Sequence, residues 1–546
     1  MIGRRRETER RLTVSLSSSS NAIARMVNPS GKARKNIPAT MLISLSLVSL
    51  GFFLNGHIAP AGLLADEGYL WYGSIRTAAG DIPIRDFASY DPGRYVWSAF
   101  WFKLLGDSGI ISLRLATAAL SVFGLTCGLL SLRRVIQSNC MLAVMGVVLW
   151  LWMFPQFKAV NHSVSLSMVY FAVLLVEKPK VSRHFGVGIF LGLAAFFGRN
   201  HGFYGVIAYF LLILFIWYRL SRVDLPKRLV AWAFGIVIGY LPLLIMVIFI
   251  PEFLGAFWND LMFIFDYGAT NIPLPVPWPW RIDYAQLPTL DAIEQALTGT
   301  LFLVMPVFFI GAVIYLSIAP VVRLQRNPLF VAAGFVGMMY IHYAFSRADI
   351  AHLAQGIHPF LLGLISLPPR QLHRYSAQVI MPLLLLTLSL LSVGLAHPYS
   401  RYVRAPHDFT ILNLGRDNLF VDQATANVVK TVEKINYELM GPGEQLLVAP
   451  HWPGLYAILN RKSPLWDTYF LLPASSNAQL EMIKELERQN TNWVILGDVP
   501  LDGRDDLRFK SLYPLVWEYF KRDFRPIEIE GLPENYQLLK RNNSPD

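Results

Sequence analysis

The sequence predicts an α-helical polytopic membrane protein of about eleven transmembrane helices with an α/β domain at its C-terminal end. The first reason is composition, because 54% of the 546 residues are hydrophobic and only 16% are charged. A soluble domain has about a quarter charged residues. The second reason is a set of nearly charge-free runs, such as 37–56, 229–250 and 298–319, each close to the ~20 residues that cross a bilayer. Only a helix satisfies its own backbone there.

Basic residues set the expected orientation of these spans. They gather in alternate loops, at Arg133 and Arg134, around Lys178, around Arg222, around Arg323, and at Arg370 and Arg374, which places these loops in the cytoplasm. The net charge of +11 is therefore spread over loop ends, which excludes a nucleic-acid-binding patch. The expected spans are 37–57, 109–132, 139–155, 163–176, 185–198, 203–219, 229–250, 297–319, 329–345, 355–369 and 377–396.

This layout divides the chain into three parts. Residues 1–36 are polar and are expected to form a disordered cytoplasmic tail before an uncleaved first helix. Residues 37–396 form the transmembrane part, with a large first outer loop over 58–108. Residues 397–546 form the extracytoplasmic α/β domain, with strands expected at 445–449, 492–496, 526–529 and 537–539 and a helix at 477–489.

The first outer loop carries two adjacent carboxylates, Asp66 and Glu67, close to the expected membrane edge. Carboxylates near hydrocarbon are costly, so a membrane protein that keeps them there usually uses them. The alternative is that both acids favour the start of an interfacial helix. Asp86, next to Arg85, is either a site residue or one half of a structural ion pair.

The motifs of this loop resemble those of a known family. They read DEGYLWYG from Asp66, PIRDF from Pro83, DPGRY from Asp91 and FKLLGDSGIISLRL from Phe102. This spaced set resembles the first outer loop of the GT-C glycosyltransferases, in the bacterial branch related to protein O-mannosyltransferases and the lipid A aminoarabinose transferase. Ile84 stands where this branch usually has Tyr, and Gly93 where it has a second Pro. The acidic positions are unchanged.

The resemblance implies an enzyme of the bacterial inner membrane that takes a sugar from a polyprenyl-phosphate carrier outside the cytoplasm. The acceptor would be a glycan, a lipid or a protein. It also implies that Asp66 is the general base of an inverting transfer, with Glu67 and Asp86 as further catalytic candidates. Such a transfer needs a carboxylate near the attacking oxygen and cations at the leaving phosphate. No cofactor is implied.

Two other outer segments carry candidate substrate-binding residues. Arg199 and His201 follow the fifth expected span, where Arg199 either binds the carrier phosphate or reaches the lipid headgroups. Arg347, Asp349 and His352 lie between the ninth and tenth spans and either bind phosphate or sugar or form a closed structural pair. His352 and His358 match no standard metal spacing, so no metal site is predicted. Asn161 and His162 are expected to be structural.

Two other function classes remain open at this point. A transporter or flippase for lipid-linked glycans is disfavoured, because the charges cluster at one face and not within several spans. An inactive relative that serves as an assembly subunit is the other class. The tail segment 450–464 forms either an acceptor-binding surface or a packing surface against the first outer loop.

Overall fold

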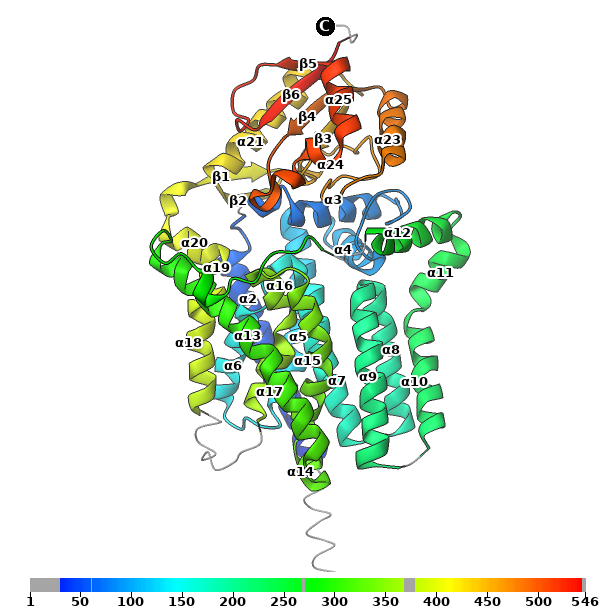
Figure 1. Cartoon of the computed structure of the whole chain (residues 1–546), viewed down its shortest axis with the longest axis vertical. Helices are drawn as coiled ribbons and strands as arrows, with labels where there is room; N and C mark the ends of the chain where they lie inside the picture. Colours follow the sequence, from blue (N-terminus) through cyan, green and yellow to red (C-terminus); the bar gives the residue numbers. More distant parts are fainter. Residues whose placement is uncertain (1–29, 60, 223, 268–270, 368–378, 543–546) are drawn as a thin grey trace, which may run out of the picture.

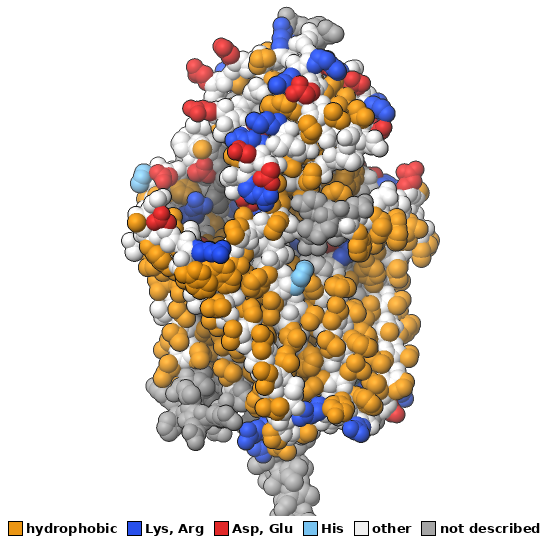
Figure 2. Space-filling model, in the orientation of Figure 1, with side chains coloured by type: hydrophobic (Ala, Val, Ile, Leu, Met, Phe, Trp, Pro, Cys, Tyr) orange, Lys and Arg blue, Asp and Glu red, His pale blue; other side chains and the backbone are white. Residues whose placement is uncertain are grey.

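The computed structural model describes residues 30–59, 61–222, 224–267, 271–367 and 379–542. A bundle of long helices carries a smaller α/β domain at one end, with a layer of short helices between the two (Figure 1). Hydrophobic side chains cover the middle of the bundle, and charged side chains gather at its two ends and on the α/β domain (Figure 2). Such an apolar surface is stable in lipid and not in water. Of the disordered tail expected over 1–36, residues 1–29 lie outside the described residues, as do Arg370 and Arg374. Residues 30–36 are helical and begin α2, so for them the expected disorder is wrong.

The bundle consists of helices that follow most of the expected spans. They are α2 (Ser30–Asn55), α5 (Ile110–Leu132), α6 (Asn139–Leu151), α7 (Ala159–Glu177), α8 (Val181–Phe197), α9 (Arg199–Phe215), α10 (Leu225–Gly239), α11 (Leu241–Phe249), α13 (Thr289–Ile318), α14 (Val321–Arg326), α15 (Pro328–Phe345), α16 (Ile350–Gly356), α17 (His358–Ile365), α18 (Met381–Leu391) and α19 (Val393–Ala396).

The number of full-length spans is smaller than the eleven expected. In the described part of the chain, six helices are long and apolar enough to cross a membrane, and two bent pairs raise this number to eight. One bent pair is α10 and α11, which meet at 53° just before Pro242. The span expected at 355–369 corresponds mainly to α17, which is separated from α16 by one residue and has Pro359 in its first turn. Proline explains both breaks, because it lacks the amide donor that a continuous helix needs.

The layer between bundle and α/β domain is formed by α3 (Asp66–Ala78), α4 (Pro92–Leu105), α12 (Phe253–Tyr267) and α20 (Pro398–Arg404). α4 begins at Pro92, which is preset for a first turn, and ends at Gly106 in the left-handed conformation (φ 65°). α3 begins with Asp66 and Glu67, whose charges suit the positive end of a helix dipole. The first outer loop is therefore largely helical.

The C-terminal region is a mixed α/β domain, as predicted. Its main sheet has the order β3-β4-β6-β5, in which β3 and β4 are parallel and the other pairs antiparallel. A separate hairpin of β1 and β2 precedes it and was not predicted. The elements are β1 (Phe409–Leu414), β2 (Asp417–Asp422), α21 (Gln423–Lys434), β3 (Gln445–Ala449), α22 (Gly454–Ile458), α23 (Ser476–Arg488), β4 (Thr491–Gly497), α24 (Phe509–Leu512), α25 (Pro514–Asp523), β5 (Phe524–Ile527) and β6 (Tyr536–Arg541).

The first outer loop and the α/β domain share one hydrophobic core. Leu63, Leu70 and Trp71 of the loop pack in the same cluster as Val448 and Tyr456 of the domain. Backbone hydrogen bonds join the two parts as well, from Phe420 N to His57 O (2.7 Å), Ala59 N to Phe420 O (2.9 Å), Gly454 N to Leu64 O (2.9 Å) and Ala88 N to Trp466 O (2.8 Å). The segment 450–464 thus packs against the first outer loop, which is the second of the two roles considered for it.

A very close backbone approach in this interface lies between Gly68 of α3 and Gly454 of α22. A Cβ atom at Gly68 would lie 2.4 Å from the Cα of Gly454, so backbone would have to move. We expect Gly68→Ala to destabilise the chain by about 1–3 kcal/mol through overpacking. The measurement is the melting temperature in detergent, with Gly62→Ala as control, because no atom lies within 4 Å of a Cβ there. An equal melting temperature for both variants would contradict the close packing.

Candidate active site

Asp66 lies in the first turn of α3, half-buried, where the first outer loop faces the α/β domain. Its charge acts on two tyrosine hydroxyls. After burial, the charge of Asp66 is the next cause that raises the pKa of both Tyr90 and Tyr469. Tyr69, one helical turn after Asp66, contacts both rings, edge-on to Tyr90 (centroids 5.1 Å apart) and tilted against Tyr469 (5.6 Å). We call Tyr69, Tyr90 and Tyr469 the tyrosine triad.

The triad hydroxyls are held in their protonated form. Burial raises the pKa of all three, with nearby negative charge as a further cause. The three side chains are nevertheless only half-buried, so solvent reaches them in a recessed position. Protonated hydroxyls in such a position donate hydrogen bonds to an anion or a sugar oxygen.

Two cations contact Tyr90 as well. Lys158 Nζ donates a hydrogen bond to the Tyr90 hydroxyl (2.8 Å) and lies 4.5 Å from the ring centroid. The Arg94 guanidinium lies 5.1 Å from the same centroid and donates to Asn161 Oδ1 (2.8 Å) and Phe197 O (2.8 Å). Within the described ranges, neither cation is paired with a carboxylate. A carboxylate and two unneutralised cations therefore flank one tyrosine.

Asn161, in the first turn of α7, connects this region to the bundle. Its Oδ1 lies 2.9 Å from Nε2 of His201, and its Nδ2 donates to the Tyr343 hydroxyl (2.8 Å) and to Gln355. His201 is fully buried and its Nδ1 lies 2.9 Å from the Tyr340 hydroxyl. His201 thus lies behind Arg94 and not beside Asp66, and it orients the amide that the guanidinium contacts.

Arg199 is neutralised by two carboxylates. Its Nε lies 2.6 Å from Asp91 Oδ1 and its Nη2 2.7 Å from Asp260 Oδ2 of α12. An arginine held in this way must release a carboxylate before it binds a phosphate. The substrate-binding role expected for Arg199 stays a prediction, and the geometry gives it a role in fixing α12 against the start of α4.

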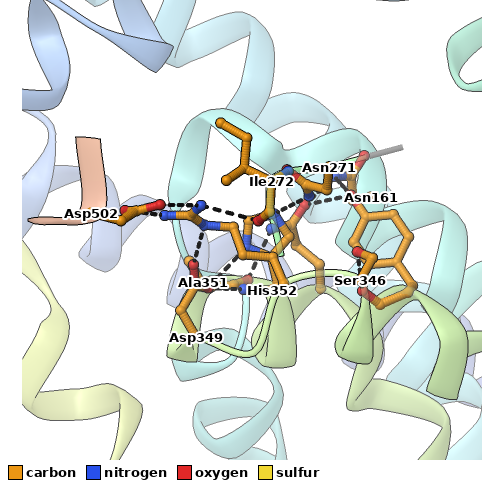
Figure 3. A network of polar contacts seen from close by, with 11 residues as sticks. Asn161, Asn271, Ile272, Ser346, Asp349, Ala351, His352 and Asp502 are labelled. Carbon is orange, nitrogen blue, oxygen red and sulfur yellow. Dashed lines mark hydrogen bonds and ion pairs between the residues drawn. The ribbon is translucent and has the colours of Figure 1, made fainter. Parts of the chain in front are cut away.

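Arg347, Asp349 and His352 form a single network of polar contacts, and Figure 3 shows Asp349, His352 and Asp502 within it. Arg347 Nε donates to Asp349 Oδ2 (2.9 Å), and His352 Nδ1 lies 2.8 Å from Asp349 Oδ1. Burial opposes ionisation of Asp349, but the hydrogen bond with His352 holds its pKa below the usual range. The remaining Arg347 nitrogens form a fork on Asp502 of the α/β domain, at 2.7 and 2.8 Å. His352 Nε2 lies 2.8 Å from Asn271 Nδ2.

Glu67 and Asp86 point away from this cluster into ion pairs. Glu67 is buried and receives two hydrogen bonds from Arg114 of α5, at 2.7 and 2.8 Å. Asp86 accepts from Arg85 (2.8 and 3.0 Å) and from Ile82 N (2.7 Å), which closes the turn over 82–86. Their catalytic roles stay predictions. In the structure Glu67 anchors α3 and so fixes the position of its neighbour Asp66.

Asp467 is a further carboxyl near the site, and sequence reasoning did not identify it. It lies in the segment between α22 and α23, and its Oδ1 accepts a hydrogen bond from Tyr469 N (3.0 Å). Burial raises its pKa to about 6, and its charge in turn helps raise the pKa of Tyr69. One feature of its sequence context, PLWDTYF, could have identified it, because it is a lone acid in an apolar run. Nothing in that context indicates which loop the carboxyl faces.

Metal ligands are not gathered anywhere in the described part of the chain, where no group of three His, Cys, Asp or Glu side chains could hold an ion. His352 and His358 have separate surroundings. His358 is buried in the bundle, with its ring 5.6 Å from that of His162 and its Nε2 3.3 Å from Leu149 O.

Comparison with solved structures finds proteins with a similar fold. The structure of ArnT from Cupriavidus metallidurans bound to undecaprenyl phosphate matches with a TM-score of 0.50 and 12% identity, over 92% of this chain and 98% of that one. The chain has the GT-C fold. An oligosaccharyltransferase of Archaeoglobus fulgidus gives a TM-score of 0.47 and 11% identity, over 93% and 75% of the two chains. The sequence itself matches no family model and no curated protein.

Titration of Asp467 gives a test of its burial. The unfolded chain loses this proton at about pH 4 and the folded chain at about pH 6. Between these values the folded state binds more protons, so the contribution of Asp467 to stability is lost as the pH rises. We expect the stability of wild type relative to Asp467→Asn to fall, by on the order of 2 kcal/mol, from pH 4.5 to 7.5.

The measurement is the melting temperature of both proteins in detergent across this range. The asparagine side chain of the variant keeps an acceptor for Tyr469 N and cannot titrate, so the difference between the two curves isolates the carboxyl. Parallel curves would show that Asp467 is solvated.

Proposed function

We propose that this chain transfers a sugar from a polyprenyl-phosphate carrier to a glycan, lipid or protein acceptor on the extracytoplasmic face, with inversion, and that Asp66 is the general base. The observation that carries the proposal is the surroundings of Tyr90, which interacts with the carboxylate of Asp66 and contacts the cations Lys158 and Arg94. The fold supports it, since ArnT has the same fold and binds undecaprenyl phosphate.

The chemistry assigns one role to the carboxylate and another to the two cations around Tyr90. An inverting transfer needs a base that takes the proton of the acceptor hydroxyl as that oxygen attacks the anomeric carbon. On the opposite side of the sugar the carrier phosphate leaves, and its charge must be stabilised by fixed cations. Asp66 suits the first role. Lys158 and Arg94 suit the second, because neither is paired with a carboxylate in the described part of the chain.

The other predicted residues support this site in the proposal. Glu67 positions Asp66 through the buried pair with Arg114, and His201 positions Arg94 through Asn161. Arg347, Asp349 and His352 adjoin this site in the proposal, because the His352 ring stacks on that of Tyr343 (centroids 6.5 Å apart) and Tyr343 accepts a hydrogen bond from Asn161. Removing one member of a buried ion pair typically costs about 3–5 kcal/mol, so we expect substitutions at Glu67 or Arg114 to lower stability first and activity as a consequence.

The test separates the base from the phosphate-binding cations. Asp66→Asn should lower transfer roughly 100-fold or more and leave binding of the carrier nearly unchanged. Lys158→Ala should weaken binding of undecaprenyl phosphate about tenfold or more, because a charged hydrogen bond contributes about 1.5–3 kcal/mol. Purified protein in detergent is assayed for release of free polyprenyl phosphate from a panel of radiolabelled polyprenyl-phosphate sugars.

Lys103→Ala is the matched control for Lys158, since Lys103 is exposed on α4 and close in sequence to the site. Equal release by wild type and Asp66→Asn would refute the proposed base. Binding without turnover across the whole panel would favour the transporter or assembly-subunit classes.

A further inference from the structure

The ion pair between Arg347 and Asp502 joins the membrane region to the α/β domain. Both terminal nitrogens of the guanidinium point at the two carboxylate oxygens (2.7 and 2.8 Å), and Arg347 also donates to Ile272 O (3.2 Å). Figure 3 shows Asp502 reaching in from a separate segment toward the network of Asp349 and His352. This fork is the geometry with which arginine binds a phosphate, so Asp502 occupies the position that an anionic ligand of Arg347 would take.

Asp502 differs from the other acids in its segment, 498–508. Asp498, Asp505 and Asp506 pair with Lys510, Arg508 and Arg504 of the same stretch or directly after it (2.9, 2.6 and 2.6 Å). Asp502 is the one carboxylate of this segment that pairs with a residue of the membrane region, as far as the described residues show.

The backbone at Asp502 is also unusual. Its φ is 55° and that of Gly503 is 71°, so two successive residues adopt the left-handed conformation. Such a conformation costs about 1 kcal/mol for a residue other than glycine, although Asp tolerates it better than most. The turn projects the carboxylate out of the domain, and its cost indicates that the surrounding structure fixes the position of Asp502.

Arg347 lies near enough to the candidate active site to respond to a ligand there. Its partner Asp349 contacts His352 (2.8 Å), and the His352 ring stacks 6.5 Å from the ring of Tyr343. The Tyr343 hydroxyl accepts a hydrogen bond from Asn161, which contacts Arg94. The side chains of Arg347 and Asp502 are 18% and 15% exposed, so water reaches both and the pair can open without unfolding of either part. A pair of this kind exchanges one anion for another at little cost in desolvation.

We propose that Asp502 is an exchangeable counter-ion that the carrier phosphate displaces from Arg347, so that donor binding releases the 498–508 segment from the membrane region. This inference rests on the proposed function, because it takes a polyprenyl phosphate as the ligand. The phosphate receives the same two N–H groups that Asp502 gives up. The α/β domain stays in place through its shared core with the first outer loop, and only the segment that carries Asp502 moves.

The consequence is measurable as competition. A carboxylate tethered next to Arg347 competes with a phosphate for the guanidinium. The apparent affinity for the phosphate then equals the intrinsic affinity multiplied by the fraction of molecules in which the pair is open. If the pair is closed in about nine of ten molecules, its removal tightens the apparent Kd about tenfold. A merely structural pair would show the opposite sign, since its loss would disorder the site and weaken binding.

The experiment measures the Kd of undecaprenyl phosphate for the full-length chain in detergent. We expect Asp502→Asn to bind at least about threefold more tightly than wild type. Asn adopts the left-handed conformation readily, so this variant keeps the turn. Asp506→Asn is the matched control, with the same loss of charge in the same segment, and should bind like wild type. In an Arg347→Ala background, Asp502→Asn should give no gain.

Three results would overturn the inference in distinguishable ways. An unchanged or weaker Kd for Asp502→Asn, with measurable binding by wild type, refutes the exchange but leaves the proposed function intact. Absence of binding and of transfer in wild type and every variant refutes the proposed function and the exchange with it. An equal gain for Asp506→Asn would attribute the effect to net charge and likewise refute the exchange.

Discussion

The structure of the candidate site depends on the core that the first outer loop shares with the α/β domain. Asp66 comes from the loop and Tyr469 from the domain, and neither part alone would place the two together. The contact of Gly68 with Gly454 shows how close the two backbones approach. Backbone hydrogen bonds at Phe420, Gly454 and Ala88 fix the register between them. The α/β domain therefore contributes residues to the candidate site itself.

Charge pairing then decides which residues remain available to a ligand. Arg114, Arg199 and Arg347 each meet at least one carboxylate, whereas Lys158 and Arg94 meet a tyrosine, an amide and a carbonyl. A cation with a carboxylate partner must exchange it before it binds a phosphate, and an unneutralised cation binds directly. The site therefore contains two kinds of cation, and the difference between them follows from their partners and not from residue type.

Sequence reasoning predicted the membrane class and the α/β domain, because these depend on composition, periodicity and local patterns. It also predicted β3, β4 and α23 closely, since their patterns are local. It did not find Lys158, Tyr469, Asp467 or Asp502 as site residues, because their roles depend on contacts between segments up to several hundred residues apart. Nor did it predict that a new helix, α17, begins within the apolar run 355–369, where Pro359 interrupts the helical hydrogen bonding.

Arg347 pairs with Asp349 of the membrane region and Asp502 of the α/β domain. This pairing explains why the α/β domain retains a strained turn at Asp502. Asp349 alone would leave both terminal nitrogens of Arg347 without a carboxylate in a partly buried position, which is unfavourable. Asp502 satisfies them from the α/β domain, at the cost of a left-handed residue. A permanent partner could have come from the membrane region itself without that cost. A partner supplied by a separate projecting turn can leave without disturbing α3 or the tyrosine triad, and this separation is what exchange with a ligand requires.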